Sequence, residues 1–142
     1  MSMADSIFTK IIEREIPADI VFENEEVIAF VDIAPVNKGH VLVVPKRPFE
    51  NLFDGDEEML CAMIVAAKNL APVVRDAVGA DGVTLVMNNG SDVGQEVMHA
   101  HLHIVPRFKN DGSFSTVKCG CYDENEASVL ATQISAALSD EA

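Results

Sequence analysis

Three of the four histidines in this 142-residue chain alternate with apolar residues in the segment His99-Ala100-His101-Leu102-His103. Alternation is the period of a β-strand, whose successive side chains point to opposite faces of a sheet. The pattern predicts a strand from Val97 to Val105 in which one set of side chains faces a core, namely Ala100, Leu102 and Ile104. The three imidazoles then share the opposite face, where they can act together.

The rest of the chain predicts a mixture of helices and short strands. Apolar residues at helical spacing indicate a short helix that begins at Asp5 or Ser6 and runs to Glu15, and a long one over residues 56–78. Pro72 lies inside the long run, so a kink or two segments are expected there. A closing helix is expected over residues 124–138. Further strands are expected at Ile20–Glu23, Val27–Asp32, His40–Pro45 and Gly82–Asn88.

Short turns between adjacent strands predict an antiparallel α+β domain. The chain lacks the strand–helix–strand alternation of a dinucleotide-binding fold and has no phosphate-binding P-loop motif. Its length of 142 residues predicts a single domain, residues 1–142. A nucleotide would therefore have to bind without a dinucleotide-binding fold and without a P-loop.

Composition excludes several functional classes. The net charge of −13 argues against a nucleic-acid partner, because nucleic-acid binding needs clustered Lys and Arg. No apolar run approaches the roughly 20 residues of a membrane span, and no secretion signal opens the chain, so we expect no membrane partner and a cytoplasmic location.

Cys61 is expected in the core. Cys119 and Cys121 lack the second ligand pair of a zinc site.

The spacing of the histidines bears on two possible functions, metal binding and nucleophilic catalysis. Same-face positions on a strand lie roughly 6.6 Å apart, so three imidazoles on one straight strand reach a single metal ion poorly. A zinc site would need His40 or a carboxylate brought in from elsewhere, and we expect no metal and no cofactor. Neutral imidazole is instead a good nucleophile near pH 7, which suits attack on phosphorus.

The loop before the histidines fits an anionic ligand. Gly90 and Gly94 permit backbone conformations in which successive N–H groups converge on an anion. Asn88, Ser91 and Gln95 supply uncharged donors. The alternative is that the loop is an ordinary β-turn and that the strand beside it is rich in histidine by chance. The residues by themselves indicate an anion-binding centre that processes phosphoryl groups.

The segment from His99 to Val105 resembles the signature of the histidine triad (HIT) superfamily, in which three histidines alternate with hydrophobic residues. Stretches at residues 6–18, 29–35 and 39–46 resemble its Hint branch, the histidine triad nucleotide-binding proteins. The likeness covers about residues 5–108, which leaves residues 109–142 as a C-terminal tail. It implies a five-stranded antiparallel sheet with flanking helices, in a homodimer whose two sheets join. A cytoplasmic protein of this kind could also enter the nucleus.

The resemblance also implies a reaction. Conjugates of adenosine or guanosine monophosphate would be cleaved at the α-phosphate through a nucleotidyl-histidine intermediate. His101 matches the nucleophile, and the backbone carbonyl of His99 is expected to accept the other ring N–H of His101. His103 should contact phosphate oxygens, and His40 should lie behind the triad and order it.

Further positions match substrate contacts of the family. Asp32 matches a carboxylate that accepts from the ribose hydroxyls. Residues that match the purine pocket are also plausible core residues: Ile7, Phe8, Ile11, Phe30 and Ile33. Residues that match phosphate and leaving-group contacts are Asn88, Gly94, Gln95 and Val97. Lys46 and Arg107 are nearby bases to which no role is assigned.

Two positions depart from the family pattern. Ser6-Ile7-Phe8-Thr9 stands where some relatives have zinc-binding cysteines, which argues further against a metal. Glu96 stands where many relatives have Ser or Thr, and we expect it at the rim of the site, beside a leaving amine. The leading hypothesis is a nucleoside phosphoramidase. A dinucleoside polyphosphate hydrolase and a nucleotide-binding regulatory protein with vestigial catalysis are the alternatives.

Overall fold

The computed structural model describes residues 6–112 and 119–141. The chain divides into two compact units, which comprise residues 1–111 and 112–142. Asp5, one of the two expected helix caps, lies outside the described residues. In the described part of the chain, no helix is long and apolar enough to cross a lipid bilayer.

The first unit is built on a five-stranded antiparallel sheet with the order β1-β2-β3-β5-β4. This architecture confirms the predicted α+β class. The strands are β1 (Ile20–Glu23), β2 (Val27–Val31), β3 (Val41–Pro45), β4 (Gly82–Val86) and β5 (Leu102–Arg107). Two short 3-10 helices, η2 (Leu52–Asp54) and η3 (Ser91–Val93), lie in the loops on either side of the long helix and β4.

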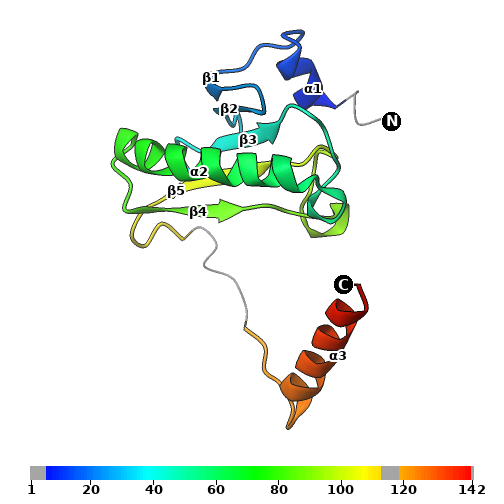
Figure 1. Cartoon of the computed structure of the whole chain (residues 1–142). Coiled ribbons are helices and arrows are strands. Elements are labelled where there is room, and N and C mark those ends of the chain that lie inside the picture. The colour runs from blue at the N-terminus through cyan, green and yellow to red at the C-terminus, as the bar shows by residue number, and fades with distance from the viewer. Residues whose placement is uncertain (1–5, 113–118, 142) are drawn as a thin grey trace. The chain divides into compact units, whose positions relative to one another are not determined.

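The long helix α2 (Glu57–Ala77) covers one face of the sheet, as Figure 1 shows. Asp56 begins the helix, since its side chain accepts from the backbone N–H groups of Glu58 and Met59. The buried side of α2 packs on alternate residues of β2, β3 and β5, a core that includes Met59, Met63, Val27, Val43 and Ile104. Ala100 and Leu102 belong to the same core, so the predicted inward set of the histidine segment is confirmed.

The short helix α1 (Ile7–Ile12) packs on the opposite face of the sheet. Its Phe8 and Ile11 are buried against the other alternating set of β2 and β3, which comprises Ile28, Phe30, Leu42 and Val44. In the register of β3 and β5, Leu42 pairs with His103. Paired residues project to the same face, so His103 lies on the α1 side of the sheet.

Some expected boundaries are wrong. Strand β5 begins at Leu102 and not at Val97, because the N–H of Ala100 donates to the carbonyl of Phe49 (2.8 Å) rather than to a neighbouring strand. Helix α1 ends at Ile12 rather than Glu15, since Arg14 adopts a left-handed backbone conformation (φ 65°).

The side chains of the long helix also differ from expectation at two positions. Cys61 is exposed and does not belong to the core, because its position on α2 lies off the buried stripe of Met59 and Met63. Helix α2 continues through Pro72 as one segment, so of the two expected alternatives, a kink or two segments, the second is wrong. Pro72 is exposed, so water can reach the backbone carbonyl that lacks a helical N–H partner.

The second unit contains helix α3 (Glu126–Glu141), close to the expected closing helix at residues 124–138. At its start, the N–H of Asp123 donates to the Glu126 carboxylate (3.0 Å) and the N–H of Glu126 donates to the Asp123 carbonyl (3.1 Å). These reciprocal bonds fix the first turn.

Candidate active site

His101 is held by the backbone of its own segment. Its Nδ1 lies 2.8 Å from the carbonyl oxygen of His99, and a carbonyl can only accept, so the ring proton is assigned to Nδ1. The Nε2 atom therefore carries the free lone pair that a nucleophile needs. The Phe8 ring packs against the imidazole in a T-shaped arrangement, with ring centroids 4.9 Å apart.

His99 is fully buried and serves as a structural support. Its Nε2 donates to the carbonyl of Pro45 (2.9 Å), which leaves Nδ1 as an acceptor for the hydroxyl of Ser6 (2.8 Å). Ser6 is also the N-cap of α1, because its Oγ accepts from the N–H of Thr9. One serine thus joins the start of α1 to the first imidazole of the triad, a contact that sequence reasoning missed.

His40 and His103 are joined by a hydrogen bond whose direction can be assigned. The N–H of Val36 donates to Nδ1 of His40 (3.1 Å), so the proton of His40 is assigned to Nε2. That proton is donated to Nδ1 of His103 (2.9 Å), which places the proton of His103 on Nε2. His103 therefore offers an N–H donor beside His101, whose ring centroid lies 4.9 Å from its own.

Asp32, His40 and His103 approach one another closely enough to resemble a metal site. One ligand atom from each lies within 4.8 Å of the others. A metal-binding histidine, however, normally donates its second ring N–H to an acceptor. Nδ1 of His40 faces the N–H of Val36, which is a donor, so His40 keeps its proton on Nε2 and is not free to bind a metal there.

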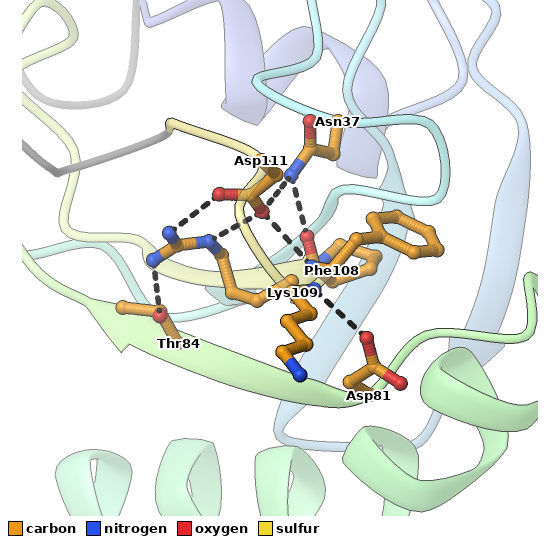
Figure 2. Close-up of polar contacts among 8 residues, drawn as sticks. Asn37, Asp81, Thr84, Phe108, Lys109 and Asp111 are labelled. Atoms are coloured by element: carbon orange, nitrogen blue, oxygen red, sulfur yellow. Dashed lines mark hydrogen bonds and ion pairs between the residues drawn. The ribbon is translucent and has the colours of Figure 1, made fainter.

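A hydrogen-bond network around Asn37 and Asp111, which Figure 2 shows, anchors the loop that leads to His40. The side-chain amide of Asn37 donates to the carbonyl of Pro106 (2.8 Å) and to the carboxylate of Asp111 (3.1 Å). The carbonyl of Asn37 in turn accepts from the N–H of His40 (3.1 Å). The segment that follows β5 therefore fixes the loop on which His40 stands.

Arg107 completes this network. Its Nε and Nη2 atoms donate to the two carboxylate oxygens of Asp111 (2.9 and 2.7 Å), and Nη1 donates to Thr84 (3.2 Å). The carboxylate of Asp111 raises the pKa of the Arg107 guanidinium. Arg107 thus belongs to the anchor at the end of β5, and Lys46 forms an ion pair with Glu23 (2.7 Å).

Burial holds all four histidines in the neutral form. Loss of water contact is the main cause that lowers the pKa values of His40, His99 and His101. The pKa of His103 falls to about 4, because burial and the neighbouring imidazoles of His101 and His40 both disfavour its charged form. Near pH 7 the cluster therefore contains neutral imidazoles, the state that a nucleophile requires.

An apolar pocket lies between α1 and strand β2. Its lining includes every residue that the family resemblance assigned to the purine pocket, and also Asp32: Ile7, Phe8, Ile11, Phe30 and Ile33. Phe8 and Phe30 are buried, whereas Ile33 is 94% exposed. One carboxylate oxygen of Asp32 accepts from the N–H of Ala34 (2.9 Å), which fixes the side chain at the rim of the pocket.

The loop before the triad is organised around Gln95, whose side chain is 2% exposed. Its Oε1 accepts from the N–H of Gly90 (2.9 Å) and from Asn51 (3.3 Å). Its Nε2 donates to the carbonyls of Glu50 (2.6 Å) and Val97 (3.1 Å). The predicted phosphate contact of Gln95 stays a prediction, and it would have to compete with these bonds.

Asn88 and Gly94 meet within this loop. The amide of Asn88 donates to the carbonyl of Gly94 (3.4 Å). Gly94 has a φ of 108°, a backbone conformation that requires glycine, and a Cβ there would also lie close to the Asn88 amide, at 3.3 Å. Val97 packs on the α1 core, and Glu96 is exposed.

Comparison with known proteins agrees with this geometry. The HIT domain model matches residues 13–110, which include His40 and all three residues of the triad. The chain belongs to the HIT family. An uncharacterized HIT-like protein of Methanocaldococcus jannaschii is 47% identical over 121 residues, which are 83% of this chain and 93% of that protein.

Solved structures share the HIT fold over nearly the whole chain. A HIT family protein of Bacillus anthracis is 32% identical with a TM-score of 0.87, and the match covers 96% of this chain and 99% of that one. A histidine triad nucleotide-binding protein of Candida albicans is 26% identical with a TM-score of 0.87, covering 97% and 100%. Such neighbours point to the Hint branch of the HIT family.

Three supports of this HIT site carry no sequence signal of their own. They are the Ser6 hydroxyl on His99, the Val36 N–H on His40 and the Asn51 amide on Gln95. The Ser6 and Asn51 donors reach partners that are distant in the sequence, whereas Val36 and His40 belong to the same loop. The alternation of the triad predicts where imidazoles gather, but the pattern does not indicate which polar groups fix their tautomers.

Proposed function

We propose that this chain is a purine nucleoside phosphoramidase, which cleaves a nucleotide conjugate at its α-phosphate through a nucleotidyl-His101 intermediate. The observation that carries the proposal is the assigned tautomer of His101, which leaves its Nε2 free, together with the neighbouring ring of His103, whose centroid lies 4.9 Å away. The name of the Candida albicans relative, a nucleotide-binding protein, supports a nucleotide as the ligand.

The reaction proceeds in two displacements. The lone pair of His101 Nε2 attacks the α-phosphorus, and the bond from phosphorus to the leaving nitrogen breaks. That nitrogen keeps the bonding electrons, takes a proton from solvent and departs as an amine. Water then attacks phosphorus, the bond to Nε2 breaks with its electrons returning to the ring, and the water proton passes to solvent.

The described residues suit the charge changes in these steps. The imidazole ring becomes positive when Nε2 is bonded to phosphorus, and its Nδ1–H bond to the His99 carbonyl strengthens as it does so. The Nε2–H of His103 can donate to a phosphate oxygen as negative charge builds there. His40 keeps that donor in place through its bond to His103 Nδ1.

Nucleotide recognition uses the pocket beside α1. Its mostly apolar walls suit the faces of a purine, and Asp32 at its rim suits the ribose hydroxyls. The proposed ligands are therefore conjugates of adenosine or guanosine monophosphate. A homodimer, as in the Hint resemblance, is part of the same proposal.

The test compares kcat/KM for adenosine phosphoramidate with the values for diadenosine tri- and tetraphosphate. A higher value for the phosphoramidate supports the proposal, and a higher value for the polyphosphates assigns the chain to the hydrolase alternative. Rapid acid quench of the enzyme with labelled substrate should trap acid-labile nucleotide on the protein. Nucleotide binding without turnover of either substrate class would indicate a regulatory protein and overturn the enzymatic proposal.

A further inference from the structure

The loop between β2 and β3, residues 32–40, carries His40 at its last position and closes on itself. The N–H of Asp32 donates to the carbonyl of His40 (2.9 Å), and the N–H of His40 donates to the carbonyl of Asn37 (3.1 Å). The N–H of Val36 donates to Nδ1 of the His40 ring (3.1 Å). The orientation of this ring therefore depends on where the backbone of Val36 and Asn37 lies.

The side chain of Asn37 connects the loop to β5 and to the turn that follows it. Its Nδ2 donates to the carbonyl of Pro106 (2.8 Å) and to Oδ2 of Asp111 (3.1 Å). Both partners are acceptors, so the orientation of the amide is fixed, because its oxygen in the same place could bond to neither. The loop also packs closely on this strand, since a Cβ on Gly39 would lie 3.2 Å from the Pro106 ring.

The carboxylate of Asp111 is itself held firmly. Arg107 donates to both of its oxygens (2.9 and 2.7 Å), and the N–H of Phe108 donates to Oδ2 (2.9 Å), the atom that also accepts from Asn37. The side chain of Asp111 is 9% exposed, so water competes little for these bonds. Figure 2 shows the bonds around the carboxylate. Asn37 is therefore attached to a rigid part of the molecule.

The position of His40 decides the position of a proton on His103. The Nε2–H of His40 donates to Nδ1 of His103 (2.9 Å), which leaves the His103 proton on Nε2. A His40 ring that lost the Val36 donor could take up its other tautomer, with the proton on Nδ1. His103 would then lose the donor that fixes its own tautomer.

We propose that Asn37 and Asp111 are positioning residues, which hold the His40 loop so that His103 presents its Nε2–H to the substrate phosphate. The inference rests on the proposed function, in which that N–H donates to a phosphate oxygen. Neither residue has to touch the substrate for this role. Their bond keeps the His103 donor in one orientation, and a donor that is oriented in advance stabilises the transition state without further reorganisation.

The first variant is Asn37→Ala, which removes both bonds of the amide and keeps the backbone carbonyl that accepts from His40. Nitrogen-15 NMR of the histidine rings near pH 7 distinguishes a protonated ring nitrogen from an unprotonated one. In the wild type we expect His40 to be a single tautomer with its proton on Nε2. In Asn37→Ala the signals of its two ring nitrogens should move toward each other, because the ring exchanges between tautomers.

Turnover of adenosine phosphoramidate gives a second measurement on the same variant. The value of kcat should fall by about ten-fold, a part of the roughly 10²–10³-fold loss that follows complete removal of a donor to a developing oxyanion. KM should change by less than about two-fold, because Asn37 does not line the apolar pocket and the affected bond strengthens in the transition state.

Asp111→Asn is a milder variant, because it keeps the shape of the side chain and gives the Asn37 amide a neutral acceptor in place of a charged one. It should change the His40 spectrum in the same direction and lower kcat by about two-fold.

Asp81→Ala is the matched control. The Asp81 carboxylate accepts from the N–H of Lys109 (2.8 Å), so it anchors the same turn through Lys109 rather than through Asn37. This variant should leave both the His40 spectrum and kcat unchanged.

The outcomes separate the two proposals. An unchanged His40 spectrum in Asn37→Ala overturns the positioning role and leaves the proposed function standing, and so does a changed spectrum with unchanged kcat. An equal change in Asp81→Ala also overturns the role, because a general loosening of the turn would then be responsible. If Asn37→Ala does not fold, Asp111→Asn decides by the same two measurements. A wild type without turnover overturns the proposed function itself, whereas the spectra still show whether Asn37 and Asp111 hold His40.

Discussion

The Nδ1 of His101 lies 2.8 Å from the backbone carbonyl of His99, and the Nδ1 of His99 lies 2.8 Å from the hydroxyl of Ser6. The first bond fixes the tautomer of His101, and the second fixes the residue that supplies the carbonyl. Hydrogen bonds of this kind, together with packing, hold a functional side chain in one orientation.

Replacement of His101 by alanine should abolish turnover and leave nucleotide binding nearly intact. The reason is that His101 does not line the apolar pocket and does not bond to the loop around Gln95, although it packs against Phe8. Calorimetry with adenosine monophosphate measures the binding, and single-turnover kinetics measure the chemistry. Near-normal turnover in His101→Ala would assign the nucleophile elsewhere.

Activity should persist to lower pH than an ordinary histidine allows. Burial lowers the pKa of His101, so the neutral nucleophile predominates below pH 6.5. The acidic limb of the kcat/KM profile should therefore fall below pH 6.5. A limb centred above pH 7 would contradict the prediction, because it would require a raised pKa in the folded enzyme.

Stability should decline as the pH falls from 6.5 toward 4. The pKa of His103 is about 4 in the folded protein, whereas an unfolded histidine titrates near 6.5. In this window the unfolded state binds more protons, so unfolding becomes easier by up to about 1.4 kcal/mol per pH unit for this group. Urea denaturation at pH 7 and pH 5 measures the change, and His103→Gln should reduce it.

Asp32 should discriminate ribose from deoxyribose. A carboxylate that accepts from a ribose hydroxyl gains a charge-assisted bond worth about 1–3 kcal/mol. A 2′-deoxy substrate should therefore lose about 5- to 150-fold in kcat/KM on the wild type. Asp32→Asn should shrink this difference. Equal rates on ribo and deoxyribo substrates would show that Asp32 serves mainly to hold the loop through Ala34.

Removal of the Ser6 hydroxyl should affect both stability and chemistry. Ser6→Ala loses a helix cap and leaves Nδ1 of buried His99 without its closest donor, which should cost about 1–3 kcal/mol. The value of kcat should fall more than the affinity for nucleotide, because His99 positions His101. Asp56→Ala is the control, since Asp56 caps α2 and pairs with Arg47 rather than with a histidine of the triad, and should lower stability with kcat unchanged.

The chain should form a dimer in solution. Helix α2 buries one side against the sheet and still exposes Ile64, Val65 and Val73, each at least half accessible. An apolar surface of this kind on an ordered helix favours association. Sedimentation at micromolar concentration measures the state, and Ile64→Glu should shift it toward monomer. A wild type that is monomeric under these conditions would refute the proposal.

The sequence by itself determined the fold class and the positions of its elements. Alternation in β2 and β3 and helical spacing in α2 reflect which side chains avoid water, and each pattern is local to its element. The same logic placed Ala100, Leu102 and Ile104 in the core and the imidazoles on the other face. The motif residues also identified the HIT family, because three histidines that alternate with apolar residues are specific to it.

Only the tertiary structure decided how His40 and His99 are protonated and which charges face the imidazoles. Their tautomers depend on the Val36 N–H and the Pro45 carbonyl, which the residue pattern does not indicate, whereas the bond from His101 to the His99 carbonyl was expected from the family resemblance and is present. The start of β5 at Leu102 likewise depends on the carbonyl of Phe49, which comes from a distant loop. Hydrogen bonds between distant segments form only when the chain has folded, so the sequence specified the groups while the fold chose their partners.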